Sequence, residues 1–315
     1  MEWKTDILGN EFRQLTVNQG LDYDGPVRCT VVRYAKSPGK GRGVLYVHGF
    51  SDYFFQAHVA KMFYAHGYDF YAVDLRKYGR SIMDRETMFQ VKNLREYFDD
   101  IQAAIGAMKD ENIHDVVLMG HSTGGLTASL YMMEMPDDSI RGLILNSPFL
   151  TWNMHPLVIK FGIPVVKALS HLWPHLKMRS DTTNRYAASV ARHLGGEWDY
   201  DTNWKSDVLP AVTAQWVAAI DNAQKALRGG TIKVPVLLLH SDKSAGGRDG
   251  MDKFRKADGV LNVVTMAEAG RKLGPNVEEV TINDGLHDLV LSRKEVRDVV
   301  FDAIFHWLES IFPEG

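Results

Sequence analysis

A serine between two glycines stands where a strand pattern gives way to a helical pattern. The apolar run Val116–Met119 is followed by Gly120-His-Ser122-Thr-Gly124 and then by helical spacing. A serine at such a turn has a strained backbone, and flanking glycines remove the clashes that side chains would cause there. The helix that follows directs its N-terminal amides at the place where negative charge develops. The pattern therefore predicts that Ser122 is a nucleophile.

A serine hydroxyl is a weak nucleophile and needs a general base. In sites of this type the orienting acid and then the base follow the serine along the chain. His287 comes directly after the strand pattern Val277–Ile282, and we expect it to be the base. His306 lies inside the last amphipathic helical pattern, where a structural role is expected.

Two aspartates compete for the position of the orienting acid, which should follow the apolar run Val234–His240. Asp258 precedes an apolar pair, a helical pattern, a strand pattern and His287, an order that fits the acid. Asp242 lies nearer to the run and is the alternative. We expect Asp258 to be the acid, with residues 245–256 as an insertion before it. On this interpretation Asp242 is a turn residue that orders the insertion through hydrogen bonds to the backbone.

Acyl transfer also requires N–H donors for the oxyanion. One expected donor is the backbone N–H of Thr123, the residue after the nucleophile. The other is expected from the loop after the strand pattern Val44–His48, where Phe50 N–H is the candidate. Gly49 permits a close approach of the backbone, and the Phe50 side chain can also line an acyl pocket.

The elements that must position these residues alternate between apolar strand patterns and longer helical patterns. Such alternation, with continuously apolar strands, predicts a mostly parallel sheet covered by helices on both faces. An antiparallel hairpin is expected at the N-terminal edge. The expected strands cover 12–17, 27–34, 44–48, 70–73, 116–119, 143–146, 234–240 and 277–282, and the expected helices cover 55–66, 94–109, 123–135, 263–273 and 294–311.

One segment breaks this alternation. Residues 151–209 carry helical patches interrupted by three prolines and by Gly195-Gly196, without a strand signal. A segment of this length is usually functional, so we expect a helical lid rather than a packing appendage. The α/β core then comprises residues 1–150 and 210–315. Most of the tryptophans fall in or beside the lid, which favours an apolar pocket: Trp152, Trp173, Trp198, Trp204 and Trp216.

Composition excludes several other classes of protein. The chain has 315 residues and a net charge of −3, which argues against a strongly basic nucleic-acid-binding face. Its single cysteine, Cys29, allows neither an intramolecular disulfide nor a cysteine-based zinc site. The N-terminus has no secretory signal pattern, so we expect a soluble, cytoplasmic protein. We interpret His171 and His175 as non-ligands because Pro174 separates them.

The quoted residues resemble the α/β-hydrolase superfamily, in particular its monoacylglycerol lipase, lysophospholipase and carboxylesterase group, often described as serine aminopeptidase-like. The matching pieces are His48-Gly49, Asp74-Leu-Arg-Lys-Tyr-Gly79-Arg-Ser81, Gly120-His-Ser-Thr-Gly124, the Asp258 segment and His287. The resemblance implies an eight-stranded sheet and a cap between strands six and seven, where residues 151–209 fall. It also assigns the nucleophile, acid and base roles to Ser122, Asp258 and His287.

The sequence departs from the family pattern at several positions. Lys77 replaces a usual glycine, Phe50-Ser51 follows His-Gly where many members have another glycine, and Ser244 occupies the usual position of the acid. The last departure is why Asp242 stays open as an alternative.

The expected function is hydrolysis of carboxylic esters with an apolar acyl chain through an acyl-enzyme on Ser122, without a metal or an organic cofactor. The expected partner is a small ester or lipid-like substrate, without nucleic acid or stable membrane insertion, and a homo-oligomer is possible. An aminopeptidase or a perhydrolase would use the same three residues. A non-catalytic binding protein on the same fold is the alternative from another class.

Overall fold

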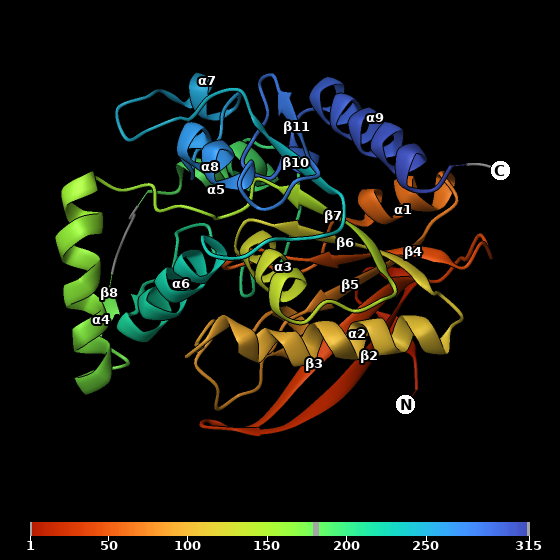
Figure 1. The fold of residues 1–315 in the computed structure, drawn as a ribbon, viewed down its shortest axis with the longest axis horizontal. Coiled ribbons are helices and arrows are strands. Elements are labelled where there is room, and N and C mark those ends of the chain that lie inside the picture. Colours follow the sequence, from red (N-terminus) through yellow and green to blue (C-terminus); the bar gives the residue numbers. More distant parts are fainter. Residues whose placement is uncertain (1, 179–182, 314–315) are drawn as a thin grey trace.

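A sheet of nine strands runs through the middle of the molecule (Figure 1). The structure is a computed structural model and describes residues 2–178 and 183–313. Within this part of the chain the strand order is β1-β2-β3-β5-β4-β6-β7-β10-β11, parallel from β5 to β11. The strands are β1 (Lys4–Asp6), β2 (Gly9–Asp22), β3 (Gly25–Tyr34), β4 (Arg42–Val47), β5 (Asp69–Asp74), β6 (Asp115–His121), β7 (Ile140–Asn146), β10 (Val236–Ser241) and β11 (Val277–Ile282).

The observed sheet confirms the predicted mostly parallel architecture and the antiparallel hairpin β2–β3 at one edge. It has one strand more than the eight expected, because Lys4–Asp6 pairs with β2 as a short edge strand. The buried carboxylate of Asp6 holds this strand in place. It accepts hydrogen bonds from Nε and Nη2 of Arg80 at 2.7 and 2.9 Å.

Helices cover both faces of the sheet. Alternate residues of each strand point to opposite faces, so Leu45 and Tyr46 belong to different apolar cores. The core that contains Tyr46 includes residues of α1 (Ala57–Ala65) and α9 (Lys294–Ile311). The core that contains Leu45 includes residues of α2 (Phe98–Asp110), α3 (Thr123–Glu134) and α8 (Val263–Gly270).

A segment of about 90 residues connects β7 to β10 and occupies the left-hand side of Figure 1. Its longest helices, α4 and α6, pack along one another. The strands β8 and β9 form a separate antiparallel pair. The elements of this segment are η3 (Val158–Gly162), α4 (Ile163–Leu172), β8 (Lys177–Met178), α5 (Arg185–Val190), η4 (Arg192–Leu194), β9 (Val212–Thr213) and α6 (Ala214–Leu227). The sequence-based division into a core and a 151–209 lid stays a prediction.

The motif Asp74–Ser81 follows β5 and fixes the neighbouring loop. Oδ1 of Asp74 accepts the backbone N–H of Phe54 at 2.9 Å, and Oδ2 accepts Arg80 N at 3.0 Å. Gly79 has φ +43°, and a Cβ there would lie 2.5 Å from Asp74 Oδ2. A glycine is therefore required at this turn. The role of the motif is to hold the chain segment that follows β4.

The remaining elements are short: η1 (Gly79–Ser81), η2 (Leu94–Tyr97), α7 (Met251–Phe254) and η5 (Leu289–Leu291). None of the helices in the described part of the chain combines the length and the hydrophobicity that crossing a lipid bilayer requires.

Candidate active site

Ser122 lies in the sharp turn between β6 and α3. Its φ of +52° is unfavourable for a residue with a side chain. The turn is held by its backbone, because Ser122 N donates to Asn146 O at 3.1 Å and Phe149 N donates to Ser122 O at 2.9 Å. A Cβ on Gly124 would lie only 2.3 Å from His48 O. The glycine flanking the serine is therefore needed for close packing of α3 against the loop after β4.

A chain of hydrogen bonds links Ser122 to His287 and Asp258. Ser122 Oγ is 3.0 Å from His287 Nε2, and His287 Nδ1 is 2.9 Å from Asp258 Oδ2. The carboxylate only accepts, so Nδ1 carries the proton and Nε2 is free to accept from the serine hydroxyl. All three side chains are buried. This is the geometry in which an imidazole can take a proton from a serine.

Asp258 reaches this position because the insertion predicted before it loops out and returns. Asp258 forms an isolated parallel bridge with Ser244, in which Ala245 N donates to Asp258 O at 2.7 Å. Oδ1 of Asp258 accepts the backbone amides of Val260 and Leu261 at 2.8 and 2.7 Å. These two amides leave Oδ2 free for His287. The aspartate therefore lies beside Ser244, the residue in the usual position of the acid.

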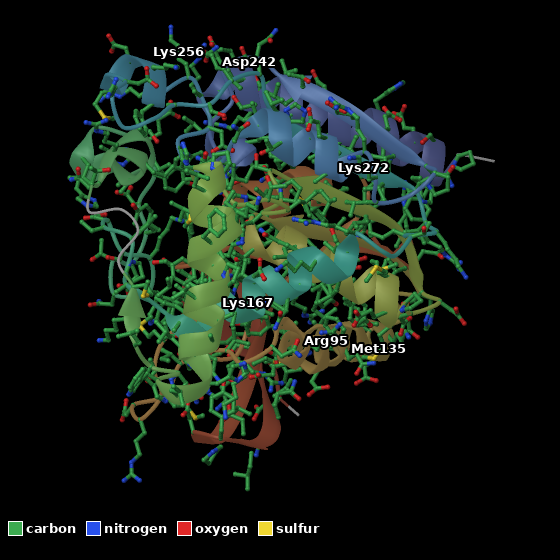
Figure 2. The ribbon with its side chains drawn as sticks, turned by 60° about the vertical axis from the view of Figure 1, so that its left-hand side comes forward. Arg95, Met135, Lys167, Asp242, Lys256 and Lys272 are labelled. Atoms are coloured by element: carbon green, nitrogen blue, oxygen red, sulfur yellow. The ribbon has the colours of Figure 1, made fainter. Side chains whose placement is uncertain are left out.

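Asp242, the alternative acid, is not brought to His287. Its carboxylate pairs with Lys243 Nζ at 2.9 Å and accepts the backbone N–H of Asp284 at 2.9 Å. Figure 2 shows Asp242 near the rim of the molecule, on the side that carries Lys256. The contact with Asp284 ties the turn after β10 to the loop after β11, which is a turn-ordering role.

The two amides expected to bind an oxyanion are unused by the protein. Within the described residues, neither Phe50 N nor Thr123 N donates a hydrogen bond to a protein acceptor. Gly49, next to Phe50, lies against the nucleophile, since a Cβ there would be 3.1 Å from Ser122 Cβ. Both donors are therefore available to a bound oxygen atom.

Aromatic rings surround the Phe50 side chain. Its ring centroid lies 5.0 Å from that of Phe89 and 4.8 Å from that of Trp216. Trp152 continues the group, 6.4 Å from Trp216. Two of the five tryptophans noted in the sequence thus belong to this group. Of the other three, Trp173 is exposed, and Trp198 and Trp204 pack on the core at His58 and Tyr53.

A buried polar cluster that sequence reasoning missed lies under the nucleophile. Asp288 accepts Asn146 Nδ2 at 2.7 Å and Gln56 Nε2 at 3.2 Å, and all three side chains are buried. His121 Nδ1 donates to Asn146 O at 3.2 Å. Burial lowers the pKa of His121, which keeps the ring neutral at pH 7. Signals were present, because Asn146 ends an apolar strand and Asp288 follows the predicted base.

Asp52 and Lys205 complete this cluster. Lys205 Nζ lies 3.0 Å from Asp52 Oδ1, and both side chains are almost fully buried. The ring of Tyr186 lies between this pair and the base, 5.7 Å from the His287 ring and 5.8 Å from Lys205 Nζ. Burial and the carboxylates of Asp288 and Asp52 raise the pKa of Tyr186 well above its usual value, so its phenol stays neutral.

Three members of the cluster have side chains that could ligate a metal. Ligand atoms of Asp52, His121 and Asp288 lie within 4.8 Å of one another. The Lys205 ammonium already pairs with Asp52, and it would repel a cation bound there. We therefore assign no metal to this site. His171 and His175 are both exposed and belong to no such group in the described residues.

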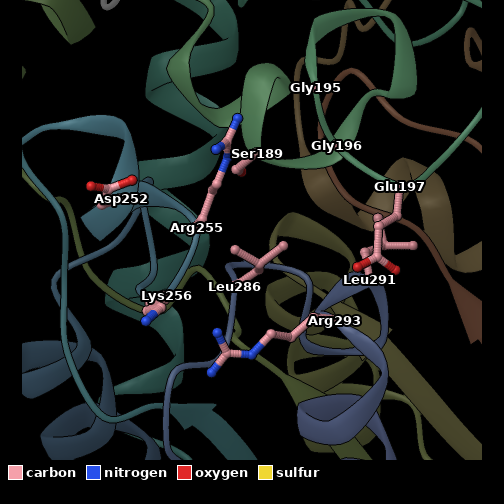
Figure 3. Close-up of a pocket in the computed structure, with 10 residues that line it drawn as sticks. All are labelled: Ser189, Gly195, Gly196, Glu197, Asp252, Arg255, Lys256, Leu286, Leu291 and Arg293. Atoms are coloured by element: carbon pink, nitrogen blue, oxygen red, sulfur yellow. The ribbon is translucent and has the colours of Figure 1, made fainter.

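A cavity of about 370 Å³ lies beside the loop that carries His287 (Figure 3). Three parts of the chain line it: the 189–197 stretch, residues 252–256 of the insertion, and the loop with Leu286, Leu291 and Arg293. Neither Ser122 nor Phe50 lines this cavity. Its walls carry the cations Arg255, Lys256 and Arg293, so it is distinct in position and in chemistry from the aromatic group.

Known proteins resemble this chain over most of its length. The sequence model of the family described as "Serine aminopeptidase, S33" matches residues 40–249, a range that includes Phe50 and Ser122 and ends before Asp258. The monoacylglycerol lipase of Mycolicibacterium smegmatis is 28% identical over 233 residues, which are 70% of this chain and 79% of that protein.

One further similarity covers less than half of the chain, and another concerns the fold alone. Phospholipase YtpA of Bacillus subtilis is 30% identical over 138 residues, 44% of this chain and 51% of that protein. A solved structure of a soluble variant of monoglyceride lipase from Saccharomyces cerevisiae matches with a TM-score of 0.67 and 16% identity, covering 94% of this chain and 97% of that one. At this identity the second likeness concerns the fold alone.

Proposed function

The chain is an α/β-hydrolase that belongs to the family described as serine aminopeptidase, S33, and from this premise we propose that it cleaves carboxylic esters with an apolar acyl chain. The hydrogen-bonded series Ser122–His287–Asp258 is the observation that carries the proposal. The relatives named monoacylglycerol lipase and phospholipase support an ester rather than an amide as the substrate.

The first half of the reaction forms an acyl-enzyme. Ser122 Oγ attacks the carbonyl carbon of the ester while His287 Nε2 takes the hydroxyl proton. Asp258 stabilises the resulting imidazolium through the bond to Nδ1. The carbonyl oxygen becomes an oxyanion, and the Phe50 and Thr123 amides donate to it. The intermediate then collapses, and the alcohol leaves with the proton from His287.

The second half releases the acid. Water attacks the acyl carbonyl while His287 Nε2 takes its proton, and the same two amides receive the second oxyanion. Collapse of this intermediate returns the proton to Ser122 Oγ and frees the carboxylic acid. None of these steps requires a group other than the residues named and water.

We propose that residues 151–209 form a cap over this site. Tyr186 of α5 contacts the His287 ring, and Trp204 packs against Tyr53 of the loop after β4 with centroids 5.1 Å apart. Ser122 itself is only 7% exposed, a burial that supports a cap above it. A cap in this position selects the substrates that reach Ser122.

The outer side of the cap supports a lipid-like substrate. Residues 151–178 contain three lysines and no acidic residue, although the whole chain is acidic. Exposed apolar side chains concentrate there, with eight of the fourteen large ones in the described chain. They are Met154, Leu157, Val158, Phe161, Val165, Leu172, Trp173 and Leu176. We call this set the apolar stripe, and we propose that it docks on the lipid aggregate that holds the ester.

Labelling with a fluorophosphonate tests the nucleophile. We expect one adduct, on Ser122, and loss of p-nitrophenyl ester hydrolysis by roughly 10⁶-fold in Ser122→Ala, which retains its fold. If the fluorophosphonate forms no adduct with the wild-type chain, the proposal of an enzyme is refuted and a ligand-binding protein is favoured. Undiminished turnover by Ser122→Ala would refute the nucleophile.

A panel of substrates then defines the class. Esters of increasing chain length, monoacylglycerols, lysophospholipids and aminoacyl amides are offered to the same preparation. We expect the highest kcat/KM for an apolar acyl ester. Preference for aminoacyl amides would favour an aminopeptidase, and peracid formation with hydrogen peroxide would favour a perhydrolase. A cytoplasmic location and self-association stay predictions from the sequence.

A further inference from the structure

An exposed turn of the proposed cap points one buried lysine toward the core. Residues 201–203 are exposed, whereas the Lys205 side chain is only 7% exposed. The turn is well defined, because Trp204 N and Lys205 N both donate to Asp201 O, at 3.1 and 2.9 Å. The turn fixes the backbone of Lys205, and burial and the bond to Asp52 fix its ammonium.

Lys205 is the partner on which Asp52 depends. Lys205 Nζ donates to Asp52 Oδ1 at 3.0 Å, and no other donor in the described residues bonds to this carboxylate. Asp288 adds a second buried negative charge nearby, while His121 is neutral. Lys205 thus supplies the positive charge of the cluster. A buried carboxylate without its cation is strongly unfavourable, so this pair ties the two segments together.

The same turn contacts the residues on either side of Asp52. Ser206 N donates to Ser51 Oγ at 3.4 Å, and Asp201 N donates to Tyr53 Oη at 2.8 Å. Trp204 packs edge-on against the Tyr53 ring. Three consecutive residues of the loop after β4 are therefore held by one turn of the cap.

These three residues directly follow Phe50, whose amide is the proposed oxyanion donor. Ser51 has φ +50°, a conformation that a residue with a side chain keeps only when its surroundings impose it. Ser51 is one peptide unit from the Phe50 N–H, so relaxation of its φ would turn that amide away. An oxyanion donor acts only within hydrogen-bonding distance of the oxygen.

We propose that Lys205 is a positioning residue whose ion pair with Asp52 holds the Phe50 amide toward the developing oxyanion. The inference rests on the proposed function, because it requires Phe50 to be an oxyanion donor. It gives the cap a part in the chemical step, in addition to control of substrate access. Lys205 acts through Asp52 and does not contact the reacting atoms.

The variant Lys205→Met tests this role with a short, soluble p-nitrophenyl ester. We expect kcat to fall by about 10²-fold, as when one oxyanion donor is lost, with KM within about twofold of the wild type. Affinity for a trifluoromethyl ketone should fall by a similar factor, because its adduct with Ser122 carries the same oxyanion. A merely structural ion pair would not link these two losses.

Lys167→Met is the matched control, because Lys167 also belongs to the cap and also pairs with an aspartate, Asp221, at 2.6 Å. Within the described residues, Lys167 Nζ donates to Asp221 and Asn222 of α6 and to no residue of the loop after β4. This control should keep kcat within about twofold of the wild type. Loss of kcat by Lys167→Met would show that any disturbed ion pair in the cap lowers the rate, and would overturn the assignment.

The double variant Lys205→Met/Asp52→Asn removes the pair without leaving the Asp52 carboxylate buried and unpaired. We expect it to regain part of the thermal stability lost by Lys205→Met while kcat stays low, because the ion pair no longer holds the loop at Asp52. Recovery of kcat would overturn the proposal, as would unchanged kcat or a rise in KM alone in folded Lys205→Met. A wild-type chain that neither hydrolyses esters nor labels at Ser122 would instead overturn the proposed function.

Discussion

The proposed catalytic centre and the segment between β7 and β10 are held in place by different means. Ser122 directly follows β6, Asp258 bridges to Ser244 in the loop after β10, and His287 lies in the loop after β11, so all three are carried by loops at the ends of parallel strands. In its described residues the segment has one strand pair of its own, two residues long. It contacts the core through the buried face of α6, which packs against α3, and through individual side chains such as Lys205 and Trp198.

The two regions differ in how firmly the backbone positions their functional residues. Ladders of backbone hydrogen bonds between neighbouring parallel strands fix the loops that carry these residues relative to one another. The segment instead presents exposed apolar residues outward, packs the buried face of α6 on the core, and adds anchoring side chains such as Lys205. Changes in the centre should therefore act on the chemical step, whereas changes on the outside of the segment should act on substrate capture.

The largest expected effect concerns the orienting acid. Asp258→Asn should lower kcat by roughly 10⁴-fold on a p-nitrophenyl ester, because an amide does not hold the correct tautomer of His287 or stabilise its imidazolium. Asp242→Asn is the control and should stay within about threefold of the wild type, since its carboxylate lies at Lys243 and Asp284. Steady-state kinetics with both variants test this prediction. A larger loss of kcat in Asp242→Asn than in Asp258→Asn would refute the assignment of Asp258 as the acid.

The second prediction separates capture from chemistry. Replacing Phe161 and Leu172 of the apolar stripe by serine should raise KM for a long-chain monoacylglycerol in anionic vesicles by about tenfold, a loss near 1.4 kcal/mol. Turnover of a short soluble ester should not change. Val264→Ser, at an equally exposed site on α8, is the control. If the control shows the same rise in KM, the stripe has no special role.

An effect on stability rather than on turnover is expected from pH at the junction of the two regions. His58 stacks on Trp198 at 4.2 Å, its Nε2 donates to Val290 O, and burial lowers its pKa to about 4. The unfolded state therefore binds the proton first, so the stability held above pH 6.5 is lost as pH falls toward 4.

His58→Phe removes this titration. Between pH 7 and 4.5, the free energy of unfolding in urea should fall by about 1–3 kcal/mol more for the wild type than for the variant. His306→Phe, at an exposed position in α9, is the control and should follow the wild type. Parallel curves for His58→Phe and the wild type would contradict the prediction.

The smallest expected effect is at Cys29. Its thiol is fully buried in β3, and burial raises its pKa to about 12. Iodoacetamide should therefore neither modify the native chain nor lower its activity, whereas urea-unfolded chain should react. Inhibition of the folded chain through Cys29 would show that the core opens near the sheet edge.

Much of the fold was predictable because it depends on local patterns. Each apolar run expected between residues 44 and 282 lies in or largely overlaps a strand of the main sheet. The turn at Ser122 was predictable in part from local contacts, because a Cβ on Gly120 would lie 2.7 Å from Gly124 O, whereas Gly124 is required by the distant His48. The edge strand Lys4–Asp6 was not, because its three residues contain no apolar run and the Arg80 that holds Asp6 is distant in the sequence.

The candidate site was predictable only where residue type limits the choice. The chain has a single Gly-x-Ser-x-Gly in the right context and a single histidine after β11 and before the last helix, whereas two aspartates fitted the position of the acid. The polar cluster was missed because Asp52, His121 and Lys205 come from three different elements. No spacing rule connects residues that meet only when the segment folds back on the core.

The sequence by itself determined the chemistry offered by this protein: a serine in a strained turn, a histidine after the last strand, and an acidic residue between them. Short-range sterics and strand patterns suffice for that. Only the tertiary structure decided which aspartate meets His287, because a loop of more than ten residues returns to Ser244 before the acid. It alone also placed Lys205 beside Asp52, since the partner of a buried charge is set by packing across the whole chain.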